Sequence, residues 1–324
     1  MTGRRILIVA HAYRADTVAA ASRAVALARK LGATPVIDAE DLAALVEHAP
    51  ELAGTAALGR DVPVADIDIA VVLGGDGTIL RATELVREGT APVLGVNMGH
   101  VGFLAEIERD DMDQAVLRAI AGDYQVEERL ALDVSVKDEN DEVVYRTWAL
   151  NEAAVEKDQR ERMIEVVVEI DRRPLTAYGT DGVVIATPTG STAYNFSAGG
   201  PVIWPTVQAI AVVPLSAHAL FSRPLVVGPE HAVAVELATH STGTGVLWCD
   251  GRRSHPLPGG TRVVVRRSDR PVLLARLHPA EFTDRLVRKF KLPTDGWRGP
   301  SPDASTGRID MPEGAVGEEL ERDR

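Results

Sequence analysis

The run Gly74-Gly75-Asp76-Gly77-Thr78 places a carboxylate among three glycines, between an apolar segment and a helical pattern. Glycine lets the backbone turn tightly and approach a ligand without a Cβ in the way. A loop between a strand and a helix N-terminus is also where open α/β sheets bind ligands, phosphates in particular. A carboxylate is unexpected in a loop that only holds anions. It makes sense if Asp76 accepts a proton from a hydroxyl or holds a metal ion.

A plainer interpretation of the same loop is a glycine-rich turn in which Asp76 only caps the helix. Two common nucleotide-binding loops are excluded. The run fits neither the spacing of a Walker A motif nor the glycine fingerprint of a Rossmann dehydrogenase.

Small hydroxyl and glycine residues are concentrated in the run TPTGSTAY at 187–194, and the small-residue run SAGGP follows at 197–201. Such runs supply the closely spaced donors and acceptors that a phosphate or a ribose needs. An ordinary surface turn has the same composition. Asn151 and Glu152 follow a strand-like segment, and an amide beside a carboxylate can bind a ribose diol or an adenine edge. Taken alone, this pair is more typical of a turn at a strand end.

The segments that must position these residues alternate between strands and helices in the first third of the chain, which predicts an open α/β sheet. We expect Asp16 or Thr17 to cap the first helix and Gly32 to end it. The predicted strands are 5–10, 34–37, 68–73 and 92–97, and the predicted helices are 16–31, 39–57 and 78–87.

After about Asp123 the pattern changes to short runs rich in Val and Ile, separated by turn signals such as 171–174 and 258–260. This pattern predicts an all-β second domain, either a sandwich or a barrel. A last helix is predicted from Pro279 to Phe290. The predicted strands are 132–136, 142–145, 147–150, 165–170, 182–186, 209–213, 225–227, 233–237, 245–248, 262–266 and 272–277.

The composition narrows the function classes. The net charge is −12, from 35 Lys and Arg against 47 Asp and Glu, and aromatic residues make up 4%. Both features argue against nucleic-acid binding. The single cysteine, Cys249, excludes an intrachain disulfide and a cysteine-based metal cluster. The absence of a long apolar run or a secretory signal leads us to expect a cytoplasmic protein that does not enter a membrane.

Four runs together resemble the NAD kinase family in their order and spacing. They are the glycine-rich loop at 74–78, NMGHVGFL at 97–104, the pair Asn151-Glu152, and TPTGSTAY at 187–194. Each run is only suggestive, but four at the family spacing make a specific match. The resemblance extends through 197–201, 223–225 and 249–251, covers roughly residues 4–297, and looks closest to the actinobacterial branch.

The resemblance implies a kinase that transfers the terminal phosphoryl group of ATP to the 2′-hydroxyl of the adenosine ribose of NAD, giving NADP. It implies Asp76 as the proton acceptor, in a phosphate loop made of Gly74, Gly75, Gly77 and Thr78. Whether polyphosphate also serves as donor stays open. The dinucleotide contacts carried over from the family are Asp76, Gly77, Arg81, Asn151, Glu152, Arg162, Asp181, Thr192, Ala193, Tyr194, Asn195, Phe196, Ser197 and Arg252.

The resemblance also implies a domain plan and an assembly. An α/β domain at 1–123 carries the glycine-rich loop, an all-β domain at 124–278 binds the dinucleotide, and a helical segment at 279–298 returns to the first domain. The acidic tail at 299–324 has too few large apolar side chains to pack, so we expect it to be disordered. Family members are dimers or tetramers with shared sites, so we expect a homodimer or homotetramer.

No cluster of acids and histidines in the sequence forms an evident metal cage, so we expect Mg²⁺ or another divalent cation to arrive with the phosphoryl donor. Two rival functions can be weighed against the kinase. Diacylglycerol kinases and phosphofructokinases have a similar glycine-rich loop but lack the Asn-Glu pair and the hydroxyl-rich run at these positions. A protein that only senses NADP would not need a carboxylate facing a phosphate.

Overall fold

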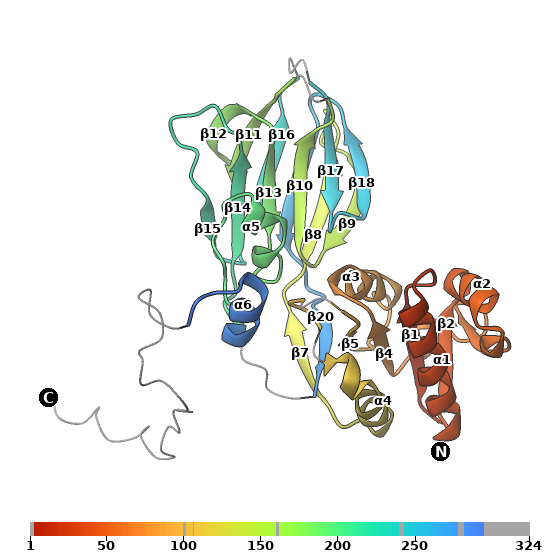
Figure 1. Cartoon of the computed structure of the whole chain (residues 1–324). Coiled ribbons are helices and arrows are strands. Elements are labelled where there is room, and N and C mark those ends of the chain that lie inside the picture. Colours follow the sequence, from red (N-terminus) through yellow and green to blue (C-terminus); the bar gives the residue numbers. More distant parts are fainter. Residues whose placement is uncertain are drawn as a thin grey trace, which may run out of the picture.

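The computed structural model describes residues 3–99, 102–105, 107–159, 162–239, 243–277 and 282–294. They form an α/β domain and a second domain of antiparallel sheets stacked above it (Figure 1), which confirms the predicted fold class. The acidic tail from Gly299, with the disorder predicted for it, lies outside the described residues. His100 and Val101 of the 97–104 run lie outside them as well.

The α/β domain is built on an eight-stranded sheet that is parallel except for one edge strand. Its strands are β3 (Ala56–Leu58), β2 (Thr34–Asp38), β1 (Arg5–Ala10), β4 (Ile69–Leu73), β5 (Val93–Asn97), β20 (Val272–Arg276) and β7 (Gln125–Arg129), with β6 (Ile107–Glu108) beside β5. The prediction that the strand at 272–277 belongs to the all-β domain was therefore wrong, because this strand is β20 of the first sheet. β20 lies inside the first sheet because Leu274 and Ala275 pack into its two apolar layers.

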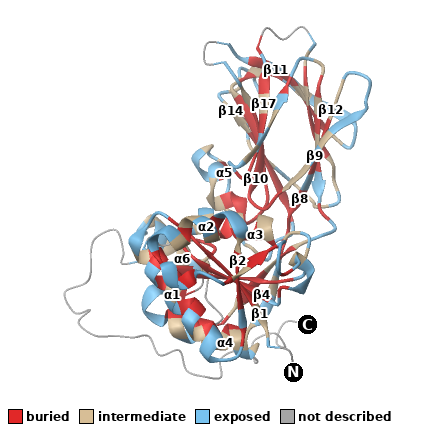
Figure 2. Cartoon of the chain, turned by 90° about the vertical axis from the view of Figure 1, so that its right-hand side faces the viewer, coloured by how far each residue is buried: buried red, intermediate tan, exposed pale blue. Residues whose placement is uncertain are grey.

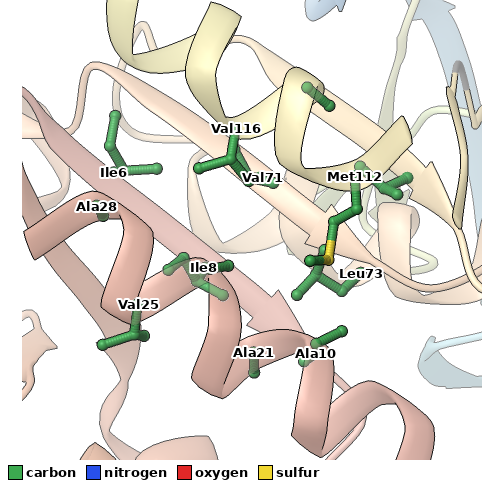
Figure 3. Close-up of a cluster of buried hydrophobic side chains, with 14 of the residues drawn as sticks. Ile6, Ile8, Ala10, Ala21, Val25, Ala28, Val71, Leu73, Met112 and Val116 are labelled. Atoms are coloured by element: carbon green, nitrogen blue, oxygen red, sulfur yellow. The ribbon is translucent and has the colours of Figure 1, made fainter. Parts of the chain in front are cut away.

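Helices cover both faces of this sheet because its central strands are apolar on both sides. On one face, α1 (Ala15–Lys30) and α4 (Met112–Ala121) pack on β1 and β4, and Figure 3 shows Val25 and Val116 converging on Ile8 and Val71. On the opposite face, α3 (Asp76–Leu85) buries Ile79 in the second apolar layer. The sheet therefore holds α3 rigidly at the end of β4.

Several predicted helix ends differ from the structure. Helix α1 begins at Ala15 with Arg14 in the capping position and no capping side chain, while Asp16 accepts hydrogen bonds from the Arg14 guanidinium. Gly32 has φ +75°, as its predicted role at the helix end requires. The helix predicted at 39–57 covers only α2 (Ala39–His48), because Pro50 disfavours helical backbone in the preceding residue.

The second domain is a sandwich of two six-stranded antiparallel sheets. Their inward side chains form one apolar core, and Figure 2 colours long stretches of the strands around it as buried. The first sheet has the order β15 (Leu225–Val227), β14 (Ile210–Leu215), β13 (Gly182–Ala186), β10 (Glu152–Lys157), β17 (Gly245–Cys249) and β18 (Arg253–Leu257). The second has the order β12 (Arg173–Thr180), β11 (Ile164–Ile170), β16 (Val233–Leu237), β19 (Arg262–Arg267), β8 (Leu132–Lys137) and β9 (Val143–Ala149).

Strands β10, β12 and β18 were not predicted. Glu152 does not lie in a turn, because it is the first residue of β10, an inner strand of the first sheet. The turn predicted at 171–174 ends earlier, and Arg173 and Pro174 begin β12. Proline is tolerated there because β12 is an edge strand.

Side chains at the C-terminal end of α3 tie the two domains together. The indole of Trp148 lies between the guanidinium groups of Arg87 and Arg253, with 4.4 and 4.5 Å from each carbon to the ring centroid. Glu84 forms ion pairs with Arg252 and Arg253, both at 3.0 Å. The helix that begins with Asp76 is therefore anchored to the β domain at its other end.

The last described helix, α6 (Phe282–Phe290), packs against both domains. Phe282 contacts Phe103 of the α/β domain and Trp204 of the β domain, with ring centroids 6.1 and 4.7 Å apart. Arg285 donates a hydrogen bond to the carbonyl of Phe103 at 2.7 Å. Among the described residues, no helix combines the length and apolar character needed to cross a membrane.

Candidate active site

The glycine-rich loop joins the end of β4 to the start of α3, as the sequence predicted. Thr78 folds back over Gly74, where a Cβ would lie 2.5 Å from its hydroxyl oxygen. Gly75 and Gly77 face open space and have no positive φ. Neither the fold nor the backbone angle requires glycine at these two positions, and the missing side chains leave the backbone open to close approach by a ligand.

The carboxylate of Asp76 is held by two backbone amides. Its Oδ2 accepts the N–H of Phe103 and its Oδ1 accepts the N–H of Leu104, both at 3.0 Å. Asp76 makes no capping hydrogen bond to α3, whose capping residue is Gly75. The interpretation of Asp76 as a helix cap was therefore wrong. The residue bonds across the loop to a segment more than twenty positions away.

A second carboxylate organises the turn that carries Asn151 and Glu152. Asp250 accepts N–H bonds from Leu150 at 3.0 Å, Asn151 at 2.7 Å and Glu152 at 3.3 Å, and it pairs with Arg253 at 2.7 Å. Burial raises the pKa of Asp250, although these bonds and Arg253 oppose the shift. Asp250 thus fixes the backbone of the Asn-Glu pair from the adjacent turn.

Glu152 is buried beside this carboxylate, with 7% of its surface exposed. Burial, reinforced by the negative charge of Asp250, raises its pKa to about 8, although a hydrogen bond from the backbone of Tyr194 opposes the shift. Its Oε2 has no hydrogen-bond partner. The pKa of Glu152 is therefore raised into the range in which the carboxyl keeps its proton at neutral pH.

The hydroxyl-rich run forms a compact loop packed on the same turn. Thr187 donates its hydroxyl to the carbonyl of Leu150 at 2.6 Å, and its N–H bonds to the carbonyl of Asn151. A Cβ on Gly190 would lie 2.0 Å from that Asn151 oxygen, so only glycine fits there. Asn195 is fully buried and donates to the carbonyls of Ser191 and Pro201. Its side chain holds the loop together from inside.

Beside this loop lies a pocket of about 410 Å³ that brings together several predicted residues. Asp181, Tyr194 and Ser197 line it together with Glu156 and Lys157, two residues that the sequence reasoning missed. The Tyr194 hydroxyl donates to Glu156 at 2.6 Å, and Lys157 pairs with Asp181 at 2.5 Å. The Lys157 ammonium holds the pKa of Asp181 below its usual value.

Helix α6 connects this half of the site to the half that holds Asp76. Phe290 packs on Phe196 of the hydroxyl-rich loop and on Phe103 of the segment that binds Asp76, with ring centroids 4.4 and 5.7 Å apart. Thr192 and Ala193 lie between Thr189 and Phe196 in the same loop, where Thr192 donates to the Thr189 carbonyl. The glycine-rich loop and the hydroxyl-rich loop are thus parts of one packed region.

Three predicted arginines lie elsewhere. Arg81 pairs with Asp41 at 2.5 Å and with Asp38 at 3.4 Å, on the side of α3 that faces β2 and α2. Arg252 pairs with Glu84 at the domain junction. Arg162 is exposed in the connection between β10 and β11, at the opposite end of β10 from Glu152. Within the described residues, no group of three or more His, Cys, Asp or Glu side chains could hold a metal ion.

The sequence reasoning also missed two charged residues on β7. Arg129 is buried, with 7% of its surface exposed, and its guanidinium reaches the Thr189 hydroxyl at 3.5 Å. It pairs with Glu127 at 2.9 Å. The available signal was the spacing of two opposite charges at i and i+2, which places them on one face of a strand. Their burial could not be inferred from it.

The chain thus joins a mostly parallel sheet, with a glycine-rich loop at the end of β4, to an antiparallel β domain with a hydroxyl-rich loop. Residues 6–124 match the family model of the ATP-NAD kinase N-terminal domain, and residues 150–277 match that of the ATP-NAD kinase C-terminal domain. The chain belongs to the NAD kinase family.

Individual relatives agree with this assignment. The chain is 61% identical to the NAD kinase of Leifsonia xyli subsp. xyli over 300 residues, which cover 92% of this chain and 97% of that protein. It is 50% identical to the NAD kinase of Thermobifida fusca over 311 residues, covering 94% and 95%. Both organisms are actinobacteria, as the resemblance predicted.

Solved structures share the fold. Yeast NADH kinase complexed with NADH superposes with a TM-score of 0.80 at 21% identity, over 91% of this chain and 89% of that one. The NAD kinase of Archaeoglobus fulgidus in complex with ATP superposes with a TM-score of 0.66 at 23% identity, over 89% and 98%. At these identities the superpositions establish the fold.

Proposed function

We propose that this chain transfers the terminal phosphoryl group of ATP to the 2′-hydroxyl of the adenosine ribose of NAD, giving NADP and ADP. The observation that carries the proposal is the position of the Asp76 carboxylate. Asp76 is the first residue of α3, its carboxylate accepts hydrogen bonds from two backbone amides, and it lies beside two glycines that face open space. The high identity to proteins named NAD kinase supports the choice of substrates.

In this proposal the glycine-rich loop binds the donor phosphates. The N–H of Gly74 bonds to the carbonyl of Val96, so the donors and the favourable dipole for an anion come from the N-terminus of α3 beyond it. These groups recognise phosphate and do not require a nucleobase on the donor. Inorganic polyphosphate is therefore proposed as a second donor for the same loop.

Asp76 acts as the proton acceptor. Each carboxylate oxygen has two acceptor positions, and Phe103 and Leu104 use one on each oxygen. The remaining positions can accept the proton of the 2′-hydroxyl while its oxygen attacks the terminal phosphorus. The bond to ADP then breaks, and phosphoryl transfer depends mainly on positioning and charge neutralisation.

The dinucleotide lies along the β domain, against the pocket lined by Asp181, Tyr194 and Ser197. The protonated Glu152 suits a ligand with two phosphates, because it donates a hydrogen bond without adding a negative charge. Asn195 acts by holding the loop, since its side chain is buried and bonded to backbone carbonyls.

We propose that Mg²⁺, or another divalent cation, reaches the site on the phosphates of the donor. This route requires no cage of protein side chains, because Mg²⁺ keeps several of its waters and binds substrate phosphates directly. When bound, the ion neutralises charge on the transferred group. We also propose that the protein is a homo-oligomer. We propose a cytoplasmic location as well, and the buried free thiol of Cys249 is compatible with such a reducing compartment.

The test is an assay of purified protein with NAD, Mg²⁺ and either ATP or polyphosphate, with NADP as the measured product. Asp76→Asn keeps the size of the side chain but removes the base. Its kcat should fall by roughly 10²–10⁴-fold, with NAD affinity nearly unchanged. A joint loss of rate and NAD or Mg²⁺ affinity would indicate a positioning role instead. A kcat near that of the wild type would end the assignment of Asp76 as base.

A further inference from the structure

The backbone of residues 103–104, which binds the Asp76 carboxylate, is itself held by hydrogen bonds from other elements. Phe103 and Leu104 give their N–H groups to the Asp76 carboxylate. Their carbonyls accept hydrogen bonds from two arginines of distant elements: Arg285 of α6 bonds to Phe103 at 2.7 Å, and Arg276 of β20 bonds to Leu104 at 3.2 Å. The position of the Asp76 carboxylate thus depends on where these guanidinium groups lie.

Glu127 fixes one of these guanidinium groups and joins it to the dinucleotide loop. Its Oε2 pairs with Arg276 at 2.6 Å, and its Oε1 pairs with Arg129 at 2.9 Å. Arg129 in turn reaches Thr189. The register of β7 on β20 places Glu127 opposite Leu274, so the arginines at 129 and 276 are its neighbours along and across the sheet face.

The charges make this arrangement depend on Glu127. Burial lowers the pKa of Arg129, and the neighbouring positive charge of Arg276 lowers it further. Burial would raise the pKa of Glu127, but the two arginines outweigh that effect and lower it. Without the carboxylate, the two guanidinium groups repel each other across a partly buried site.

We propose that Glu127 is a positioning residue that sets Asp76 relative to the dinucleotide loop, through Arg276 and Leu104 on one side and Arg129 and Thr189 on the other. This inference rests on the proposed role of Asp76. The carboxylate of Glu127 bonds to Arg276 and Arg129. Its effect on the reaction is indirect and passes through the 103–104 peptide.

The variant Glu127→Gln removes the charge and keeps the shape. We expect kcat to fall by roughly 10²-fold, because a displacement of about 1 Å at a reacting group has that effect. Exchange of the Phe103 and Leu104 amide hydrogens, measured in the protein without substrates, should become faster. The matched control is Glu128→Gln, an exposed neighbour on the other face of β7, which should leave both quantities unchanged.

A double-mutant cycle with Asp76→Asn distinguishes positioning from general destabilisation. If Glu127 acts through Asp76, adding Glu127→Gln to Asp76→Asn should lower the residual rate by less than threefold, so the two effects are not additive. The conservative variant Glu127→Asp keeps the charge and should recover part of the rate. It also serves as the test variant if Glu127→Gln folds poorly.

Two results would overturn the inference while leaving the kinase assignment intact. One is a Glu127→Gln enzyme that makes NADP as fast as the Glu128→Gln control. The other is full additivity with Asp76→Asn. A wild-type protein that makes no NADP under any donor would instead refute the proposed function, and the amide exchange would then still report whether Glu127 holds the 103–104 peptide.

Discussion

Gly102 lies so close to Asp76 that a Cβ built on its backbone would be 2.2 Å from the carboxylate Oδ1. Real atoms do not approach that closely, so any larger residue must push the carboxylate or the 102–104 backbone away. The contact explains why glycine precedes the two amides that hold the carboxylate.

The first prediction follows from this contact. Gly102→Ala should lower kcat by roughly 10²-fold, because the reacting carboxylate is displaced by about 1 Å. The control is Gly99→Ala in the same connection, where the nearest atom to a Cβ would lie 3.8 Å away. Steady-state assays of NADP formation check both variants. Equal rates for the two would contradict the packing argument.

The second prediction concerns the pH dependence of stability. Glu152 has a pKa of about 8 in the folded protein against an ordinary value of 4.5. Between these values the folded state binds a proton that the unfolded state has lost, so stability falls as pH rises through this window. The slope from this group is at most about 1.4 kcal/mol per pH unit.

Glu152→Gln is neutral at every pH and removes this contribution. The difference in Tm between Glu152→Gln and the wild type should therefore move in favour of the variant as pH rises from about 5 to about 8. Calorimetry without ligands measures it, with the exposed Glu139→Gln as control. Parallel Tm profiles for Glu152→Gln and the wild type would show that Glu152 is ionised in the folded protein.

The third prediction separates two roles of Arg81. The resemblance implies a contact with the dinucleotide, whereas the structure pairs Arg81 with Asp38 and the buried Asp41. Burial raises the pKa of Asp41 even with Arg81 beside it. Arg81→Met leaves this partly buried carboxylate without its hydrogen-bonding partner, so we expect a loss of roughly 1–3 kcal/mol of stability.

Denaturant unfolding measures that loss. The exposed pair between Arg60 and Asp61 supplies the control, since Arg60→Met should leave the free energy of unfolding nearly unchanged. The KM for NAD should change little in Arg81→Met. A large rise in KM at unchanged stability would instead support the contact that the resemblance implies.

The fourth prediction concerns assembly. The connection between β14 and β15 exposes Leu220 almost completely and Phe221 by half, next to the edge strand β15. Exposed apolar side chains beside an open strand edge are typical of a subunit interface. We expect Leu220→Asp combined with Phe221→Asp to lower the mass measured by light scattering. The control is Leu31→Asp, at an exposed position of the other domain, which should leave this mass unchanged. A fully active wild-type monomer at micromolar concentration would contradict the prediction.

The sequence by itself determined the class of the fold and the residues of the glycine-rich loop. The periods of its apolar residues are local properties, so the strands at 182–186, 225–227 and 233–237 were predicted with their observed bounds. The loop at 74–78 was also evident, because a carboxylate among glycines is a local chemical pattern. Its family followed from four such patterns in order.

Only the tertiary structure decided what these residues contact. That β20 joins the first sheet, that Asp76 bonds to 103–104, and that Arg81 pairs with Asp41 all depend on pairings between distant segments. The burial of Glu152 and Arg129 depends on the same pairings, and burial is what changes their chemistry. A side chain's type is written in the sequence, but its protonation and its partners are set by the neighbours that folding brings to it.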